Sequence, residues 1–155
     1  MDGTLKTKIL ELLDQNRLMT VATNRPDGWP QATMVGYVND GLTLYFLCGA
    51  QSQKAKNLKR DSRLSLTIGQ DTSDPMAITG LSMAAYAQAV EDPAEAAKMM
   101  SLLAARYPEY SAFPMPDPKE IQIFRVVPMV ISVLDYTKGF GHADLVPVEL
   151  PQQAA

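Results

Sequence analysis

Short β-rich runs separated by tight-turn signals constrain the fold of this chain more than any other feature. Two segments, Asn24-Arg-Pro-Asp-Gly28 and Asn39-Asp-Gly41, each carry an Asp-Gly pair, which favours the backbone angles of a hairpin turn. They separate three runs rich in apolar and β-branched residues, at 18–23, 29–38 and 42–48. Because connections this short join antiparallel neighbours, the sequence predicts an antiparallel meander.

Helical periodicity interrupts this strand pattern in three places. Two predicted helices begin at Thr4 and Ser52, whose hydroxyl groups can cap a helix. The third begins near Pro93, where a proline among acidic residues precedes a helical pattern. Further strands are predicted at residues 64–69, 121–127 and 129–134, and one or two more within residues 76–90. Six or more short strands with two or three helices predict a mainly β fold, a small antiparallel β-barrel or rolled sheet with helices. Trp29, Tyr45 and the many methionines are expected to be packing residues.

Length, charge and composition limit the class of protein. The 155 residues predict a single domain, 1–155, whose tail after about residue 146 is extended or loose. A net charge of −3 and a pI near 5.1 argue against a protein that mainly grips nucleic acid. No apolar run reaches the ~20 residues of a membrane span. The single cysteine and the lack of an export signal predict a cytoplasmic protein without an internal disulfide.

Several common kinds of site lack the residues that they need. His142 and Cys48 are the only soft metal ligands, so no metal site is expected. A Ser-His-Asp triad would need His142 as its base, but the sequence has no nucleophile-elbow motif. No Walker loop or GxGxxG motif occurs either.

A basic run, residues 52–66, is the most informative stretch and has two interpretations. It begins where a strand gives way to a helix, and a helix N-terminus binds phosphate through unpaired N–H groups. Lys54 in the first turn opposes the helix dipole, which fits an anion bound there. Alternatively, its lysines and arginines form an ordinary solvated face that Asp61 balances.

Four segments in this order resemble the pyridoxamine 5′-phosphate oxidase-like, FMN-binding split-barrel family. They are Trp29-Pro-Gln-Ala-Thr-Met-Val-Gly-Tyr37, Leu44-Tyr-Phe-Leu-Cys48, Ser52-Gln-Lys-Ala-Lys-Asn-Leu58 and Asp61-Ser-Arg-Leu-Ser-Leu66. The resemblance covers residues 12–90 well and continues more weakly to Asp135. It implies a six-stranded antiparallel split barrel that forms a homodimer, with FMN held between the two subunits.

The resemblance also implies a set of cofactor-binding residues. Lys54 matches the lysine that binds the FMN phosphate, Thr33 and Gln53 stand where the oxidase has arginines, and Ser82 matches a glutamine of the partner subunit. The implied FMN-binding residues are Thr33, Met34, Val35, Gly36, Leu47, Cys48, Ser52, Gln53, Lys54 and Ser82. For Phe140 and His142, the glycines beside them permit close approach to a flavin ring, while a solvent-exposed turn is the alternative.

Departures from the oxidase pattern define the expected function. The C-terminal substrate motif of the true oxidase is absent, so the chain resembles the general-stress branch. The resemblance implies an FMN-dependent oxidoreductase that acts on an unknown small molecule, with unidentified catalytic residues. The alternative is a binding or sensor protein for a flavin, for the deazaflavin F420, or for haem with His142 as its ligand. A nucleic-acid binder that uses the basic run is the third possibility.

Overall fold

Eight antiparallel strands form one curled sheet in the computed structural model, which describes residues 1–149. The strands follow the order β2-β1-β5-β6-β7-β4-β3, and β8 pairs with β7. Their bounds are β1 (Leu18–Asn24), β2 (Pro30–Gly36), β3 (Val38–Asp40), β4 (Thr43–Gly49), β5 (Arg63–Gly69), β6 (Thr79–Ala89), β7 (Ile121–Asp135) and β8 (Ala143–Pro147). The predicted mainly β, antiparallel class is therefore confirmed, with eight strands in place of the expected six.

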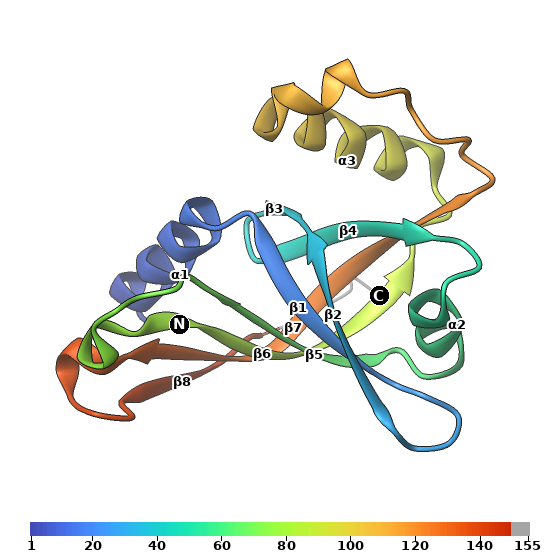
Figure 1. The fold of residues 1–155 in the computed structure, drawn as a ribbon. Helices are drawn as coiled ribbons and strands as arrows, with labels where there is room; N and C mark the ends of the chain where they lie inside the picture. The colour runs from blue at the N-terminus through green and yellow to red at the C-terminus, as the bar shows by residue number, and fades with distance from the viewer. Residues whose placement is uncertain (150–155) are drawn as a thin grey trace.

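Three helices surround the sheet. They are α1 (Gly3–Gln15), α2 (Gln53–Arg60) and α3 (Pro93–Arg106), and short 3-10 turns form η1 (Pro75–Ala77), η2 (Pro108–Ala112) and η3 (Tyr136–Lys138). Figure 1 shows α1 and α2 at opposite ends of the curled sheet, with α3 standing above β3 and β4. The first helix begins earlier than predicted, because the side chain of Asp2 and not that of Thr4 caps it.

The main hydrophobic core fills the inside of the curl. Alternate residues of β1 and β5 point inward, so that Met19, Val21 and Leu66 are buried. Leu13 of α1 and Leu58 of α2 enter the same core from the two ends of the sheet. A second, smaller core lies between α3 and the other face of β4, where Tyr45 packs with Met99.

Both predicted hairpin turns are present, but the predicted meander is wrong. Gly28 and Gly41 adopt positive φ angles of 82° and 58° in the two turns, which glycine permits without a steric penalty. The strand expected at residues 29–38 breaks at Tyr37, so β2 pairs with β1 while β3 pairs with β4. Tyr37 is 1% exposed, and its hydroxyl group donates to the backbone at the end of α1. Burial of this ring therefore splits the strand.

The C-terminal part of the sheet also differs from the prediction. Pro128 was expected to separate two strands, but β7 is continuous and a register shift opposite Ala84 and Ala85 accommodates the proline, as a bulge can. Residues 143–147 form a strand that the sequence did not predict. The tail is thus paired as far as Val148, whose N–H donates to Met129; residues 150–155 lie outside the described part.

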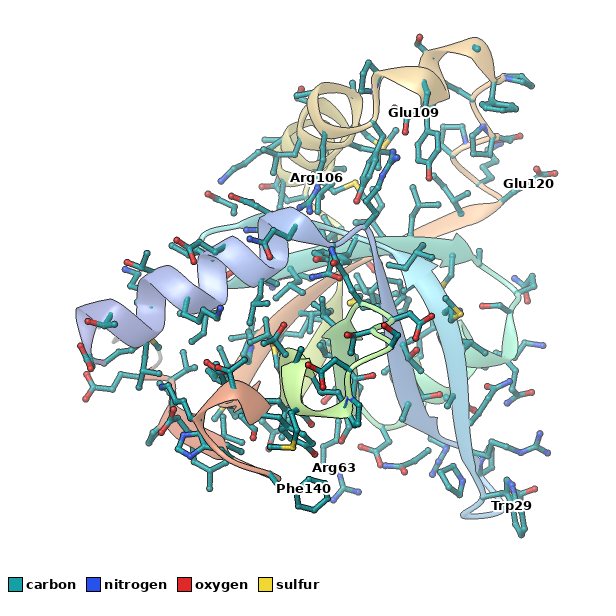
Figure 2. All side chains as sticks on the ribbon, turned by 60° about the vertical axis from the view of Figure 1, so that its left-hand side comes forward. Trp29, Arg63, Arg106, Glu109, Glu120 and Phe140 are labelled. Atoms are coloured by element: carbon teal, nitrogen blue, oxygen red, sulfur yellow. The ribbon has the colours of Figure 1, made fainter. Side chains whose placement is uncertain are left out.

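Trp29 corrects a further expectation. Its side chain is 74% exposed at the tip of the β1–β2 hairpin, where Figure 2 shows it pointing away from the molecule. It does not pack against the sheet, because the β1–β2 hairpin extends beyond the other strands (Figure 1). Tyr45, by contrast, is 6% exposed and packs as predicted.

Candidate functional site

The site begins at the first turn of α2. Ser52 is the N-cap, and its Oγ accepts a hydrogen bond from the N–H of Ala55 at 3.2 Å. Between residues 1 and 149, no backbone hydrogen bond uses the N–H of Gln53 or Lys54, as is usual in a first helical turn. Two free N–H groups, the positive end of the helix and the Lys54 ammonium group are suited to a phosphate.

Asn57 ties this helix to the sheet. Its Nδ2 donates to Thr23 Oγ1 at 3.0 Å and to Gln31 Oε1 at 3.2 Å. Its Oδ1 accepts from Gln53 Nε2 at 2.8 Å. Asn57 is 1% exposed, so these bonds are shielded from water. The network therefore fixes Gln53 against β1 and β2. Thr33 lies two residues after Gln31 on the same face of β2.

The next residues of β2 alternate between two faces. Val35 packs against the main core, whereas Met34 on the opposite face is 66% exposed. Gly36 ends the strand and, together with Leu47 of β4, lines a groove of about 400 Å³. We call this cavity the α3 groove; it is lined by Gly36, Tyr37, Val38, Tyr45, Leu47, Met99, Met100, Leu103, Tyr107, Tyr110, Phe113, Pro114, Met115, Pro116 and Ile121.

Cys48 and Ser82 lie on opposite faces of the sheet. Cys48 is 9% exposed and belongs to the main core, which leaves its backbone for a cofactor contact. Ser82 lies on the outer face of β6, in one cross-strand row with Thr67, Thr20 and Met34. Three strand spacings separate Ser82 from Met34, about 14 Å along the sheet. One chain therefore does not bring Ser82 to β2.

Phe140 and His142 lie in the turn between β7 and β8, at the end of the sheet opposite α2 (Figure 1). Phe140 is 83% exposed and packs edge-on against Tyr136. His142 Nε2 lies 3.1 Å from Asp144 Oδ2, and Lys138 Nζ lies 3.2 Å from the same oxygen. The hydrogen bonds from His142 and Lys138 hold the pKa of Asp144 below its usual value. Within one chain, this turn is remote from Ser52–Lys54.

The outer face of the sheet is uncharged over its central rows. One row runs from Met34 through Thr20, Thr67, Ser82 and Ser132 to Leu145. Met34 and Leu145, at its two ends, are 66% and 72% exposed. Two hollows of about 460 and 410 Å³ indent this face. This row thus carries four uncharged hydroxyl side chains between two exposed apolar ones.

The rest of the basic run follows the solvated-face interpretation. Lys56, Lys59 and Arg60 are exposed on α2. Asp61 does not balance them: it accepts hydrogen bonds from Arg63 and Asn24 instead, at 2.8–3.2 Å. These bonds, chiefly those from Arg63, lower the pKa of the Asp61 carboxyl group.

Two broader features concern metals and membranes. Among residues 1–149, no three His, Cys, Asp or Glu side chains converge in a way that could hold a metal ion. No helix in this range combines the length and the apolar character needed to cross a membrane.

Comparison with protein families identifies the chain. The family model described as "Pyridoxamine 5′-phosphate oxidase" matches residues 5–135. The chain belongs to this family. The resemblance that the sequence segments indicated is thereby confirmed, including its extension to Asp135.

Individual proteins that are similar to this chain agree with that assignment. General stress protein 26 of Bacillus subtilis is 27% identical over 67 residues, which are 43% of this chain and 47% of that protein. The chain thus matches about half the length of this curated relative. The structure of General Stress Protein 26 from Bacillus anthracis superposes with a TM-score of 0.71 and 16% identity, over 93% of this chain and 98% of that one.

A haem-binding protein from Mycobacterium smegmatis also shares the fold. Its structure superposes with a TM-score of 0.78 and 19% identity, over 95% of this chain and 59% of that chain. At this identity the likeness concerns the fold alone. The fold thus occurs both in General Stress Protein 26 and in a haem-binding protein.

Sequence reasoning missed the residues that position the site. Asn57 and Gln31 are separated by 26 residues, and nothing in the local pattern joins them. The α3 groove was missed for the same reason, since it combines β4, α3 and the proline-rich segment 108–118. The alternation of β-strand residues was the available signal for the outer face, because it places Thr20 and Ala22 opposite the core residues of β1.

Proposed function

We propose that two copies of this chain bind FMN between them and act as a flavin-dependent oxidoreductase on a small molecule. The observation that carries the proposal is the first turn of α2, where free N–H groups and Lys54 are fixed to the sheet by Asn57. Bound FMN would supply hydride or electron transfer at its ring, chemistry that belongs to the cofactor and not to acid–base side chains.

The chain's own residues would divide into two groups around such a ligand. Ser52, Gln53 and Lys54 would hold the phosphate, with Thr33 from the neighbouring strand. Backbone atoms of Met34, Val35, Gly36, Leu47 and Cys48 would line the ring. The oxidase has guanidinium groups at the positions of Thr33 and Gln53, and each charge-assisted contact contributes roughly 1.5–3 kcal/mol. We therefore expect weaker FMN binding than a site with those arginines would give.

A second copy is expected on the outer face of the sheet. The central rows of this face are uncharged, and no helix within residues 1–149 covers the exposed Met34 and Leu145. Ser82 lies at the middle of the same row. A partner packed there would bring its own Ser82, Phe140 and His142 toward the first subunit's β2. This arrangement agrees with the family resemblance, in which the partner subunit completes the flavin site.

Titration with FMN and riboflavin tests the proposal directly, because the two ligands differ by the phosphate. We expect the flavin-free protein to quench FMN fluorescence at micromolar concentration. Lys54→Gln should weaken FMN binding by roughly 10-fold or more while leaving riboflavin binding unchanged, since a charged hydrogen bond of about 1.5–3 kcal/mol is lost. Lys59→Gln, on the exposed face of the same helix, is the matched control.

Two results would contradict the flavin proposal. One is a purified protein that is colourless and fails to quench FMN fluorescence. The other is an equal effect of Lys54→Gln and Lys59→Gln, which would leave the helix N-terminus without a role in phosphate binding. If F420 binds and FMN does not, the phosphate site stands and the cofactor is the deazaflavin.

Haem binding is the second candidate function, and the environment of His142 favours it. A metal-bound histidine usually donates its other ring nitrogen to a carboxylate, and Asp144 Oδ2 lies 3.1 Å from His142 Nε2. This contact leaves Nδ1 of the histidine as a possible axial ligand. Added haem should then give a Soret band that His142→Ala abolishes. An unchanged band in His142→Ala would remove this candidate.

The cytoplasmic location remains a prediction from the single cysteine. Fractionation of the native cells with an antibody against the chain would test it. Recovery in the secreted fraction would contradict it.

A further inference from the structure

The α3 groove offers a second binding site beside the candidate flavin site. It is formed by three parts of the chain that are distant in sequence: β4 forms its floor, α3 one wall and the segment 108–118 the other. Figure 1 shows α3 and this segment standing above β3 and β4. Its volume of about 400 Å³ lies in the range of small-molecule sites, roughly 300–1,000 Å³.

The inner part of the groove, its floor and the α3 wall, is buried, and the outer wall is accessible. Val38, Tyr45 and Met99 are 1–6% exposed and belong to the second core. Phe113 and Met115 of the outer wall are 67% and 68% exposed. The cavity therefore has a buried base and an outer wall whose apolar side chains are largely exposed within the described part of the chain.

The lining is chemically selective. None of the fifteen lining residues is charged. The hydroxyl groups of Tyr37 and Tyr107 donate to backbone carbonyl groups. Within residues 1–149, no hydrogen bond involves the hydroxyl group of Tyr45 or Tyr110. The groove thus presents apolar, aromatic and methionine surface, with the hydroxyl group of the half-exposed Tyr110 as a hydrogen-bond donor. Such a lining disfavours an ionic ligand, because the charge would be desolvated without a partner.

The position of the groove connects it to the candidate flavin site. Gly36 and Leu47, two of the implied ring-lining residues, also line the groove. We propose that the α3 groove binds the small-molecule reactant as an uncharged, planar, largely apolar ring compound carrying one hydrogen-bond acceptor. This role as a reactant site rests on the proposed flavin function, whereas the binding preference follows from the groove alone.

Two probes with one skeleton test the preference for an uncharged ring compound. N-Phenyl-1-naphthylamine is neutral, and 8-anilino-1-naphthalenesulfonate adds a sulfonate to the same rings; both fluoresce more strongly in apolar sites. We expect the flavin-free protein to bind the neutral probe at least 10-fold more tightly than the sulfonate. Equal affinity for the two probes, or tighter binding of the sulfonate, would overturn the proposed selectivity.

Variants locate the probe. Phe113→Ser combined with Met115→Ser removes the exposed wall without opening the buried core, and should weaken neutral-probe binding at least 10-fold. Met100→Trp should also weaken it, because the larger ring fills the cavity. Met76→Ser is the matched control, since Met76 is 45% exposed in η1 and does not line the groove. Wild-type binding in the wall and filling variants would exclude the groove.

A last measurement separates this proposal from the flavin proposal. With FMN bound, the neutral probe should shift the visible absorption band of the flavin if the groove adjoins the ring. Probe binding without any FMN binding would refute the flavin function and leave the groove as a ligand site. FMN binding with no spectral shift on saturation by the probe would refute the role as reactant site.

Discussion

The hydroxyl oxygen of Tyr37 lies 2.7 Å from the carbonyl oxygen of Leu13, in the last turn of α1. This hydrogen bond connects the break between β2 and β3 to the helix that closes one end of the core. The backbone carbonyl of Tyr37 in turn accepts a hydrogen bond from Tyr107 Oη at 2.7 Å. Arg106 lies 5.1 Å from the Tyr37 ring and also binds Asn39 Oδ1, between α3 and α1 (Figure 2).

Tyr37→Phe should therefore destabilise the fold without moving the chain. The ring stays in place, and the lost hydrogen bond is worth about 0.5–1.5 kcal/mol of unfolding free energy. Urea unfolding at pH 7 measures this difference. Tyr110→Phe, which removes a hydroxyl group from a half-exposed ring, is the control and should leave the midpoint unchanged. Equal midpoints for Tyr37→Phe and wild type would contradict the importance of this bond.

The same residue predicts how stability depends on alkaline pH. Burial raises the pKa of Tyr37 from 10.0 to about 12. Between these values the unfolded chain releases the phenol proton while the folded chain keeps it, so stability falls as the pH rises. Tyr37→Phe lacks this loss. The advantage of wild type over Tyr37→Phe, fully present below pH 10, should disappear between pH 10 and 12. An advantage that is constant to pH 12 would contradict the assignment.

The break at Tyr37 also marks the limit of prediction from the sequence. The β1–β2 and β3–β4 hairpins were predictable because each depends on a few turn residues, among them Gly28 and Gly41. The pairing of β2 away from β4 depends on Tyr37 reaching α1, more than 20 residues away. Strand β8 lacked a strong alternating pattern and is stabilised by its partner β7. Long-range contacts of this kind override local preference.

The candidate site also has one part that the sequence could predict and one part that it could not. Ser52 as a helix cap follows from local chemistry, and the structure confirms it. The role of Asn57 could not be predicted from neighbouring residues, because its partners on the sheet lie on β1 and β2. Trp29 shows the opposite case: an apolar residue next to a strand was expected to pack, yet the hairpin tip leaves it no surface to pack against.

Asn57→Ala should weaken both the fold and the phosphate site. It removes three side-chain hydrogen bonds and leaves the buried Thr23 hydroxyl without its donor, at a cost of about 1–3 kcal/mol of unfolding free energy. Gln53 would lose its anchor, so FMN affinity should fall while riboflavin affinity changes less. Urea unfolding and fluorescence titration measure the two effects. Lys56→Ala, exposed on the same helix, is the control; the same result for both variants would contradict the prediction.

Ala84→Arg should prevent assembly if a second copy covers the outer face. Ala84 is exposed at the centre of β6, beside Ser65 and Val130, in the uncharged region. A guanidinium group buried there without a partner costs several kcal/mol, which would raise the dimer dissociation constant at least 100-fold. Sedimentation of the flavin-free protein should show a monomer, and FMN affinity should fall. Ala104→Arg places the same charge on an exposed position of α3 and should remain dimeric. A dimeric Ala84→Arg would show that the subunits meet elsewhere.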